Sequence, residues 1–303
     1  MADTGFEGQW ATLLAPTQIR AVLQSRGIQL KKRWGQNFLV NRGACERIVD
    51  LLDPMPDETV WEIGPGLGAL TELLLRRARA VVAFEIDRRL LEYLHSRYAG
   101  NPRIVIVQGD AVRKWQTVRD RGNLPADKVV GNLPFGSASS LVSSFVSENL
   151  TLGRAVFTMQ RELADRMMAR PRQKEYSSFS VFCQYAFNLI RRGELKPGSF
   201  FPSPRVISSI VELTPSSIRH EVHDRLAFFL LVRALFVSKR KTIRNNVLLS
   251  PALRVYNTEA VLASLEGEGI SAKMRAEELS VHDFVRVANR LHTLKPQTQK
   301  HSG

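Results

Sequence analysis

The chain has 303 residues, 44% of them hydrophobic, and its 43 Lys and Arg against 29 Asp and Glu give a formal net charge of +14. This length is typical of one large domain with a smaller one, and no apolar run approaches the ~18 residues of a membrane-spanning helix, so we expect no membrane protein. The positive balance holds on both sides of residue 202 and favours a polyanionic partner, such as nucleic acid, over the alternative of a generally basic solvated surface.

The N-terminus and the two cysteines bear on where the protein works. The first ten residues, MADTGFEGQW, lack the basic region and apolar stretch of a secretory signal. Cys45 and Cys183 show no metal-ligand spacing, so we expect reduced, buried thiols and no metal site. Both observations favour a cytoplasmic protein.

The first part of the chain is expected to be helical and basic. Apolar side chains at helical spacing predict a helix over 16–26, closed by Gly27, and another over 42–52, stopped by Pro54. Residues 30–34, LKKRW, are basic and end in an aromatic side chain. We expect the N-terminal residues 1–15 to be flexible.

From residue 59 onward, strand-like and helix-like segments alternate. Strands are expected over 59–64, 80–87, 103–110, 127–132, 154–160 and 208–215, and helices over 68–78, 88–98, 140–149 and 161–169. This alternation is typical of βαβ units, so we predict an α/β domain with a mostly parallel sheet over residues 1–215.

The pattern changes after Pro215. Helical periodicity dominates over 223–237, 258–269 and 280–292, with little strand character. We therefore predict a small helical domain over residues 216–292, followed by a flexible tail over 293–303.

The first strand runs into a glycine-rich turn, EIGPGLGAL, residues 62–70. Gly64, Gly66 and Gly68 followed by Ala69 suit a turn that brings backbone close to a ligand at a helix N-terminus. The pattern alone fits a dinucleotide site as well as other nucleoside sites. The preceding carboxylate, Glu62, suits a cationic or zwitterionic ligand such as S-adenosylmethionine better than a pyrophosphate.

Three further strands end in residues that could bind such a ligand. Glu85 could accept hydrogen bonds from ribose hydroxyls, although a surface helix cap is the alternative, which Asp87 fits better. Asp110 is placed for an adenine amine, and Asn132 ends the fourth strand. Because ligands of open α/β sheets bind at the carboxyl ends of strands, the coincidence of four strand ends favours a nucleoside cofactor site.

The segment after the fourth strand, NLPF (132–135), has two interpretations. Pro134 should end the strand, and Asn, Pro and Gly mark turns generally, so Phe135 could simply fold back into the core. Alternatively, the strand ends here so that the amide of Asn132 and the ring of Phe135 are presented side by side at the sheet edge.

Taken together, these motifs resemble the small-subunit ribosomal RNA adenine dimethyltransferase family, the KsgA/Dim type, which is related to the erythromycin-resistance rRNA methyltransferases. The motifs that carry the resemblance are GQNFL (35–39), EIGPGLGALT (62–71), FEID (84–87), GDA (109–111), NLPF (132–135), MQRELADRM (159–167), FFPSPRVISSIVEL (200–213) and LFVSKRKTIRNN (235–246). The resemblance implies a Rossmann-like class I methyltransferase domain and S-adenosylmethionine as cofactor. It also implies a monomer that acts on small-subunit rRNA, in immature small ribosomal subunits.

The resemblance also implies roles for individual residues. The cofactor would be bound by Asn37, Leu39, Gly64, Gly66, Glu85, Asp110 and Asn132. The catalytic segment would be Asn132, Leu133, Pro134 and Phe135, and the target base would stack on Phe135 and Phe200. Contacts to RNA would come from Lys31, Lys32, Arg33, Lys239, Arg240, Lys241 and Arg244. Phe200 could instead pack in the core, and charge runs are often solvated surface. The family usually has Tyr at position 135, followed by Asn and Ile, so the loop 136–140 leaves the shape of the target pocket open.

The activity expected on these grounds is dimethylation of two adjacent adenosines in the 3′-terminal hairpin of small-subunit (16S) rRNA during ribosome biogenesis. The alternatives are a large-subunit rRNA adenine methyltransferase and a non-catalytic ribosome-assembly factor that binds RNA with the same fold. A nicotinamide dehydrogenase is suggested only by the glycine turn, and no residue after Glu85 supplies a hydride-transfer acid or base.

Overall fold

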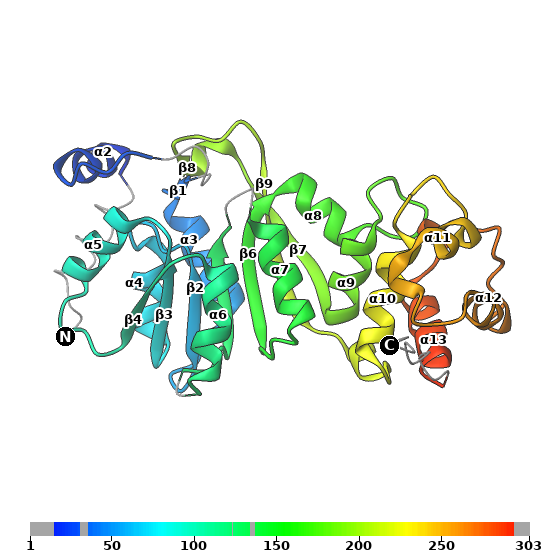
Figure 1. The fold of residues 1–303 in the computed structure, drawn as a ribbon. Coiled ribbons are helices and arrows are strands. Elements are labelled where there is room, and N and C mark those ends of the chain that lie inside the picture. Colours follow the sequence, from blue (N-terminus) through cyan, green and yellow to red (C-terminus); the bar gives the residue numbers. More distant parts are fainter. Residues whose placement is uncertain (1–14, 31–35, 123, 134–136, 294–303) are drawn as a thin grey trace, which may run out of the picture. The chain divides into compact units, whose positions relative to one another are not determined.

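The computed structural model describes residues 15–30, 36–122, 124–133 and 137–293 (Figure 1). Both chain ends predicted to be flexible fall largely outside these ranges. The same holds for Lys31, Lys32 and Arg33 and for Pro134 and Phe135, so their predicted roles are not addressed by the geometry below.

The chain divides into two compact units. The first comprises residues up to 164 together with 189–215, and the second comprises 165–188 and the chain from 216 onward. The predicted boundary at residue 215 therefore differs from the structure in one segment, because 165–188 packs with the C-terminal helices. Tyr176 donates its hydroxyl to the carbonyl of Leu279 at 2.9 Å, and the rings of Tyr185 and Phe228 lie 4.5 Å apart.

A seven-stranded sheet, in the order β4-β3-β2-β5-β6-β9-β7, forms the centre of the first unit. The five strands from β4 to β6 pair in parallel, and β9 is antiparallel to β6. The strands are β2 (Thr59–Ile63), β3 (Ala80–Glu85), β4 (Ile104–Gln108), β5 (Lys128–Asn132), β6 (Arg154–Gln160), β7 (Phe187–Leu195) and β9 (Ser208–Pro215). This topology confirms the predicted α/β fold with a mostly parallel sheet.

Helices cover both faces of the sheet, with α3 and α4 on one face and α6 and α7 on the other (Figure 1). The helices of this unit are α2 (Pro16–Ser25), α3 (Arg42–Leu52), α4 (Ala69–Arg77), α5 (Arg88–Arg97), α6 (Ala111–Asp120) and α7 (Ala138–Ser147). A separate two-stranded ribbon joins β1 (Phe38–Leu39) to β8 (Phe200–Phe201).

Local sequence explains where several of these helices begin. Asn41 caps α3 by accepting from the amide of Ala44 at 2.9 Å. Asp87 caps α5 by accepting from the amide of Arg89, as the sequence predicts. Each cap satisfies an amide that the first turn of a helix leaves without a partner.

The second unit is helical, as predicted for its C-terminal part. Its helices are α9 (Ser178–Ala186), α10 (Arg225–Leu235), α11 (Ile243–Leu249), α12 (Thr258–Gly267) and α13 (Val281–His292), while α8 (Arg161–Met168) runs into it from the first unit. Short 3₁₀ turns occur at Pro197–Ser199 in the first unit and at Ser217–His220, Pro251–Leu253 and Ala276–Glu278 in the second. Within the described ranges, no helix is long and apolar enough to cross a membrane.

Candidate cofactor and catalytic site

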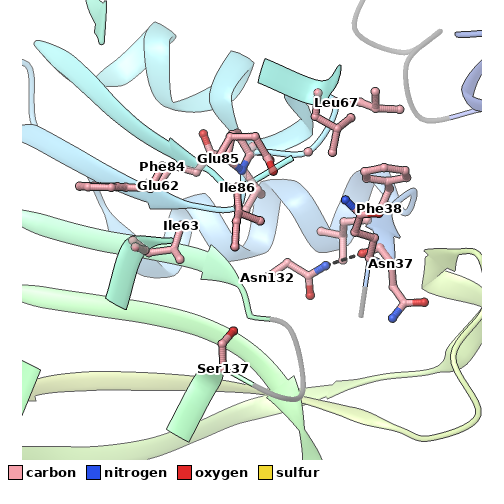
Figure 2. Close-up of a pocket in the computed structure, with 18 of the residues that line it drawn as sticks. Asn37, Phe38, Glu62, Ile63, Leu67, Phe84, Glu85, Ile86, Asn132 and Ser137 are labelled. Carbon is pink, nitrogen blue, oxygen red and sulfur yellow. Dashed lines mark hydrogen bonds between the residues drawn. The ribbon is translucent and has the colours of Figure 1, made fainter. Parts of the chain in front are cut away.

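A cavity of about 410 Å³ opens at the carboxyl ends of the parallel strands in the first unit (Figure 2). It lies where the strand order changes direction between β2 and β5, the usual ligand position in open α/β sheets. Every residue predicted to bind the cofactor lines it: Asn37, Leu39, Gly64, Gly66, Glu85, Asp110 and Asn132. The structure thus brings together residues from five separate segments of the chain.

The glycine turn shapes one wall of this cavity. Gly66 has a φ of 59°, in the left-handed region that favours glycine. A Cβ atom there would also lie 2.8 Å from the ring of Phe38, which packs against the turn. Both constraints explain the glycine at this position, and α4 begins directly after the turn.

Glu62 is buried at the cavity wall, only 1% exposed. Its Oε2 accepts a hydrogen bond from the hydroxyl of Thr71 at 2.6 Å. Burial raises the pKa of Glu62 to about 8, although the bond from Thr71 acts in the opposite direction. The ligand-free protein therefore holds Glu62 protonated at neutral pH, and a positively charged ligand beside it would favour the carboxylate form.

Glu85 and Asp110 line the same cavity from the ends of β3 and β4. Glu85 Oε1 accepts from the amide of Asp87 at 2.8 Å, and burial raises the pKa of Glu85 to about 7. Asp110 also caps α6, because its Oδ1 accepts from the amide of Val112 at 3.0 Å. These bonds fix both carboxylates and leave each with further acceptor capacity.

The two buried carboxylates predict a pH dependence of stability. The folded protein keeps protons on Glu62 and Glu85 that the unfolded chain releases near the ordinary Glu pKa of 4.5. Between the two pKa values the folded state binds more protons, so the free energy of unfolding should fall as pH rises from about 4.5 and level off above about 8. Urea unfolding followed by tryptophan fluorescence checks this expectation. All four tryptophans precede residue 116, so their fluorescence reports on the part of the chain that contains Glu62 and Glu85.

The variant Glu62→Gln should flatten this dependence, because a neutral side chain has no proton to release. Glu266→Gln, which changes an exposed carboxyl in the second unit, is the control and should leave the dependence unchanged. Equal stability of the ligand-free wild-type protein at pH 6 and pH 9 would contradict the expectation.

Asn132 is held at the end of β5 by two bonds to different elements. Its Nδ2 donates to the backbone carbonyl of Asn37 at 2.6 Å (Figure 2), and its Oδ1 accepts from the hydroxyl of Thr158 on β6 at 2.6 Å. The preceding Gly131 allows this close packing, because a Cβ there would lie 2.7 Å from the carbonyl oxygen of Ile63. The amide is therefore oriented before any ligand binds.

The other residues predicted for the target base are placed differently. Leu133 is 2% exposed, and its amide donates to the carbonyl of Thr158 at 2.9 Å. Phe200 is 4% exposed, lies in the apolar core cluster of the first unit and is not among the residues that line the cavity. Its burial favours the core-packing alternative over base stacking.

The predicted RNA contacts that the structure describes lie in the second unit, around the start of α11. Lys239, Arg240, Lys241 and Arg244 are all exposed. Buried Asn246 holds their loop, since its Nδ2 donates to the carbonyls of Leu235, Ser238 and Lys241, and its Oδ1 accepts from the amide of Ser238.

Two more loops adjoin this one. Lys239 pairs with Glu277 at 3.4 Å and also donates to the carbonyl of Lys174. Arg172 donates its amide to the carbonyl of Glu277 at 2.7 Å. The cationic surface therefore spans three loops of the second unit and the first turn of α11. We define it by its nine exposed members: Arg170, Arg172, Lys174, Lys239, Arg240, Lys241, Arg244, Lys273 and Arg275.

Several cavity residues were not predicted from the sequence. Among them are apolar side chains and one hydroxyl: Phe38, Leu67, Ile86, Val112, Ser137 and Leu141. Ile86 and Val112 lie within two residues of the predicted cofactor-binding residues Glu85 and Asp110. This proximity was the only feature of the sequence that indicated a place at the cavity. Ser137 lies at one of the positions where this chain departs from the resembled family.

The chemistry of the lining indicates which ligands fit. Three carboxylates, Glu62, Glu85 and Asp110, line the cavity, while no Lys, Arg or His among the described residues does. This composition suits a ligand with hydroxyls, an amine and positive charge better than a pyrophosphate, and the apolar walls suit a flat base. S-adenosylmethionine meets all of these conditions.

Comparisons with known proteins agree with this chemistry. The family model described as ribosomal RNA adenine dimethylase matches residues 27–293. Ribosomal RNA small subunit methyltransferase A from Borreliella afzelii (strain PKo) is 34% identical over 275 residues, 91% of this chain and 93% of the relative. The protein of the same name from Treponema pallidum (strain Nichols) is 35% identical over 274 residues, 90% of this chain and 94% of the relative.

Two solved structures are similar over most of the chain. A dimethyladenosine transferase from Plasmodium falciparum has a TM-score of 0.72 at 24% identity, covering 84% of this chain and 98% of the other, and supports the fold alone. The 23S rRNA methyltransferase ErmE has a TM-score of 0.60 at 26% identity, covering 84% of this chain and 100% of the other.

Proposed function

The chain belongs to the ribosomal RNA adenine dimethylase family, and from this premise we propose that it dimethylates two adjacent adenosines in the 3′-terminal hairpin of small-subunit rRNA. The observation that carries the proposal is the cavity in which three carboxylates and an oriented Asn132 meet. The relatives named small subunit methyltransferase A support the choice of subunit.

In this proposal the cavity holds S-adenosylmethionine, which supplies a methyl group on a positively charged sulfur. Glu85 accepts hydrogen bonds from the ribose hydroxyls, and Asp110 accepts from the adenine amine. Glu62 lies at the glycine turn, where its carboxylate favours the positive charge of the methionine part. Asn37 and Leu39 close the cavity from the segment before α3.

Asn132 and Leu133 bind the amine that receives the methyl group. Its lone pair is delocalised into the adenine ring, so the amine is a poor nucleophile until its geometry changes. The Asn132 side-chain carbonyl and the Leu133 backbone carbonyl accept hydrogen bonds from its two N–H groups. These bonds direct the lone pair at the methyl carbon. As the N–C bond forms, the S–C bond breaks, and the amine then releases a proton to solvent. Positioning and electrostatics, rather than a strong base, lower the barrier.

The target base must leave its own stack to reach this cavity, and an aromatic side chain would hold it there. We assign this role to Phe135 on the strength of the family resemblance, and stacking on one ring contributes about 1–3 kcal/mol per base. Phe200 stays a weaker candidate because it is buried in the core.

The cationic surface of the second unit supplies the contacts to RNA phosphates. Its side chains are exposed and its loops are tied together by hydrogen bonds, so the backbone positions that carry the charges are held close together. Such contacts supply affinity and position rather than sequence specificity.

Replacing Lys239, Arg240 and Lys241 by alanine should weaken binding to small subunits, most strongly at low salt. Each phosphate contact that is lost should also reduce the slope of log affinity against log salt by about 0.7–0.9. Filter binding at several salt concentrations measures both effects. The control removes three exposed arginines of the first unit, Arg76, Arg88 and Arg121, which changes the net charge equally. Equal losses in the two variants would contradict local contact and favour a general field effect.

The similarity to ErmE supports a second candidate function, methylation of large-subunit RNA. A non-catalytic assembly factor is the other alternative, since the loop after Phe135 departs from the family pattern. Incubation with labelled S-adenosylmethionine separates the three. Label in dimethyladenosine of immature small subunits supports the proposal, label in naked large-subunit RNA supports the second function, and tight RNA binding without transfer supports the third.

A further inference from the structure

We propose that Thr158 is a positioning residue that holds both acceptors of the target amine in place, an inference that rests on the proposed function. Thr158 lies near the end of β6, which pairs in parallel with β5 and places Thr158 beside Asn132. It is 1% exposed and does not line the cavity, so it acts through its neighbours.

Thr158 contacts both acceptors through different groups. Its hydroxyl donates to Asn132 Oδ1 at 2.6 Å, and its backbone carbonyl accepts from the amide of Leu133 at 2.9 Å. One residue of β6 therefore fixes the side chain of Asn132 and the backbone of Leu133, the two groups assigned to the amine. The backbone contact is available to any residue at this position, whereas the hydroxyl contact requires Thr or Ser.

The hydroxyl determines how the Asn132 amide can present its oxygen. The carbonyl of Asn37 can only accept, so it selects the Nδ2 end of the amide. The Thr158 hydroxyl then holds the opposite end and occupies one of the two lone-pair positions on Oδ1. With both ends held, the amide cannot turn about its Cβ–Cγ bond, and the remaining acceptor direction of Oδ1 is left for a ligand.

Packing alone does not explain a hydroxyl at this place. Thr158 stands in a strand, RAVFTMQ, whose inner residues are otherwise apolar and buried. Valine would fill nearly the same volume without the requirement that a buried hydroxyl find a partner. The partner that Thr158 has is the side chain at the end of the catalytic strand, which points to a role in orienting that side chain.

The test compares Thr158→Val with Thr158→Ser. Losing one oriented hydrogen bond in the transition state should lower the single-turnover rate of Thr158→Val about tenfold, with cofactor affinity and KM for small subunits changed by less than about twofold. Thr158→Ser keeps the hydroxyl and should stay within about threefold of wild type. A fully active Thr158→Val, or a Thr158→Ser as impaired as Thr158→Val, would overturn the role of the hydroxyl.

A second measurement does not depend on activity. In protein labelled with ¹⁵N-asparagine, the Asn132 side-chain amide is the signal missing from Asn132→Ala. Its protons should exchange slowly with solvent in wild type and Thr158→Ser, and quickly in Thr158→Val. Unchanged exchange in Thr158→Val would refute the proposed orientation. An inactive wild-type protein with the expected exchange pattern would instead refute the proposed function and leave the orientation of Asn132 by Thr158 intact.

Discussion

Asn132→Ala is expected to slow methyl transfer by at least about 10²–10³-fold, the range typical of removing one oriented group that stabilises a transition state. The Asn132 amide contributes an acceptor for the target amine and is itself held by hydrogen bonds to Asn37 and Thr158. Its removal therefore eliminates the acceptor together with both of these hydrogen bonds. Transfer of label from S-adenosylmethionine to small subunits in a single turnover measures the rate without interference from product release.

The fold should survive this change. Asn132 is only half-buried, and the neighbouring strand pairing between β5 and β6 uses backbone groups. Thermal melting should therefore stay close to that of wild type. Asn101→Ala is a suitable control, because Asn101 does not line the cavity. Its side-chain oxygen accepts a hydrogen bond from the amide of Arg103 in an exposed loop. An Asn132→Ala protein with wild-type transfer rates would refute the amine-orienting role.

Glu85→Gln should weaken binding of S-adenosylmethionine about 10- to 100-fold, because hydrogen bonds to a charged acceptor contribute about 1.5–3 kcal/mol each. The glutamine keeps the shape of the side chain and an oxygen for the amide of Asp87, so the local backbone should be preserved. Titration calorimetry with the ligand-free protein measures the dissociation constant directly.

This variant has a second, opposite effect on stability. Burial raises the pKa of Glu85 to about 7, so at pH 9 the ligand-free protein must hold a buried charge. Glu85→Gln should therefore be at least as stable as wild type at pH 9 while binding the cofactor less tightly. The control Glu92→Gln alters an exposed carboxylate on α5 that pairs with Arg88 and should change neither quantity. Unchanged cofactor affinity in Glu85→Gln would contradict the ribose assignment.

The strand ends of the site could be predicted because each follows a recognisable apolar segment. Glu85 and Asn132 end β3 and β5, Asp110 follows the end of β4 by two residues, and parallel strands align their carboxyl ends at one sheet edge. The glycine turn could be predicted as well. Its backbone has a positive φ at Gly66, which excludes most other residues, so the glycine itself indicates the turn. The structure brings all the predicted cofactor residues to one cavity, and their binding of the cofactor stays a prediction.

Other features depend on contacts between distant segments and left no local signal. The ribbon of β1 and β8 pairs Phe38 with Phe201, but strands of two residues show no periodicity. Strand β7 was missed because adjacent Arg191 and Arg192 interrupt its alternation of apolar and polar residues. The bond from Thr158 to Asn132 required the register of two strands, which the sequence does not specify.

The sequence also predicts the division into two units only in part. Helix α9 (Ser178–Ala186) follows the βα pattern of the first unit in sequence, yet its aromatic residues pack on α10 of the second unit. Aromatic side chains such as Phe182 and Tyr185 are equally suited to either core. Only the tertiary contacts therefore decide where the segment 165–188 belongs.

The most direct test of the central claim is mass spectrometry of the 3′-terminal fragment of small-subunit rRNA from cells with and without the gene for this protein. The proposed function predicts two adjacent N6,N6-dimethyladenosines that disappear when the gene is deleted, return with the wild-type gene and stay absent with Asn132→Ala. Two dimethyladenosines that persist after deletion, or a methylated adenosine lost from large-subunit RNA instead, would contradict it.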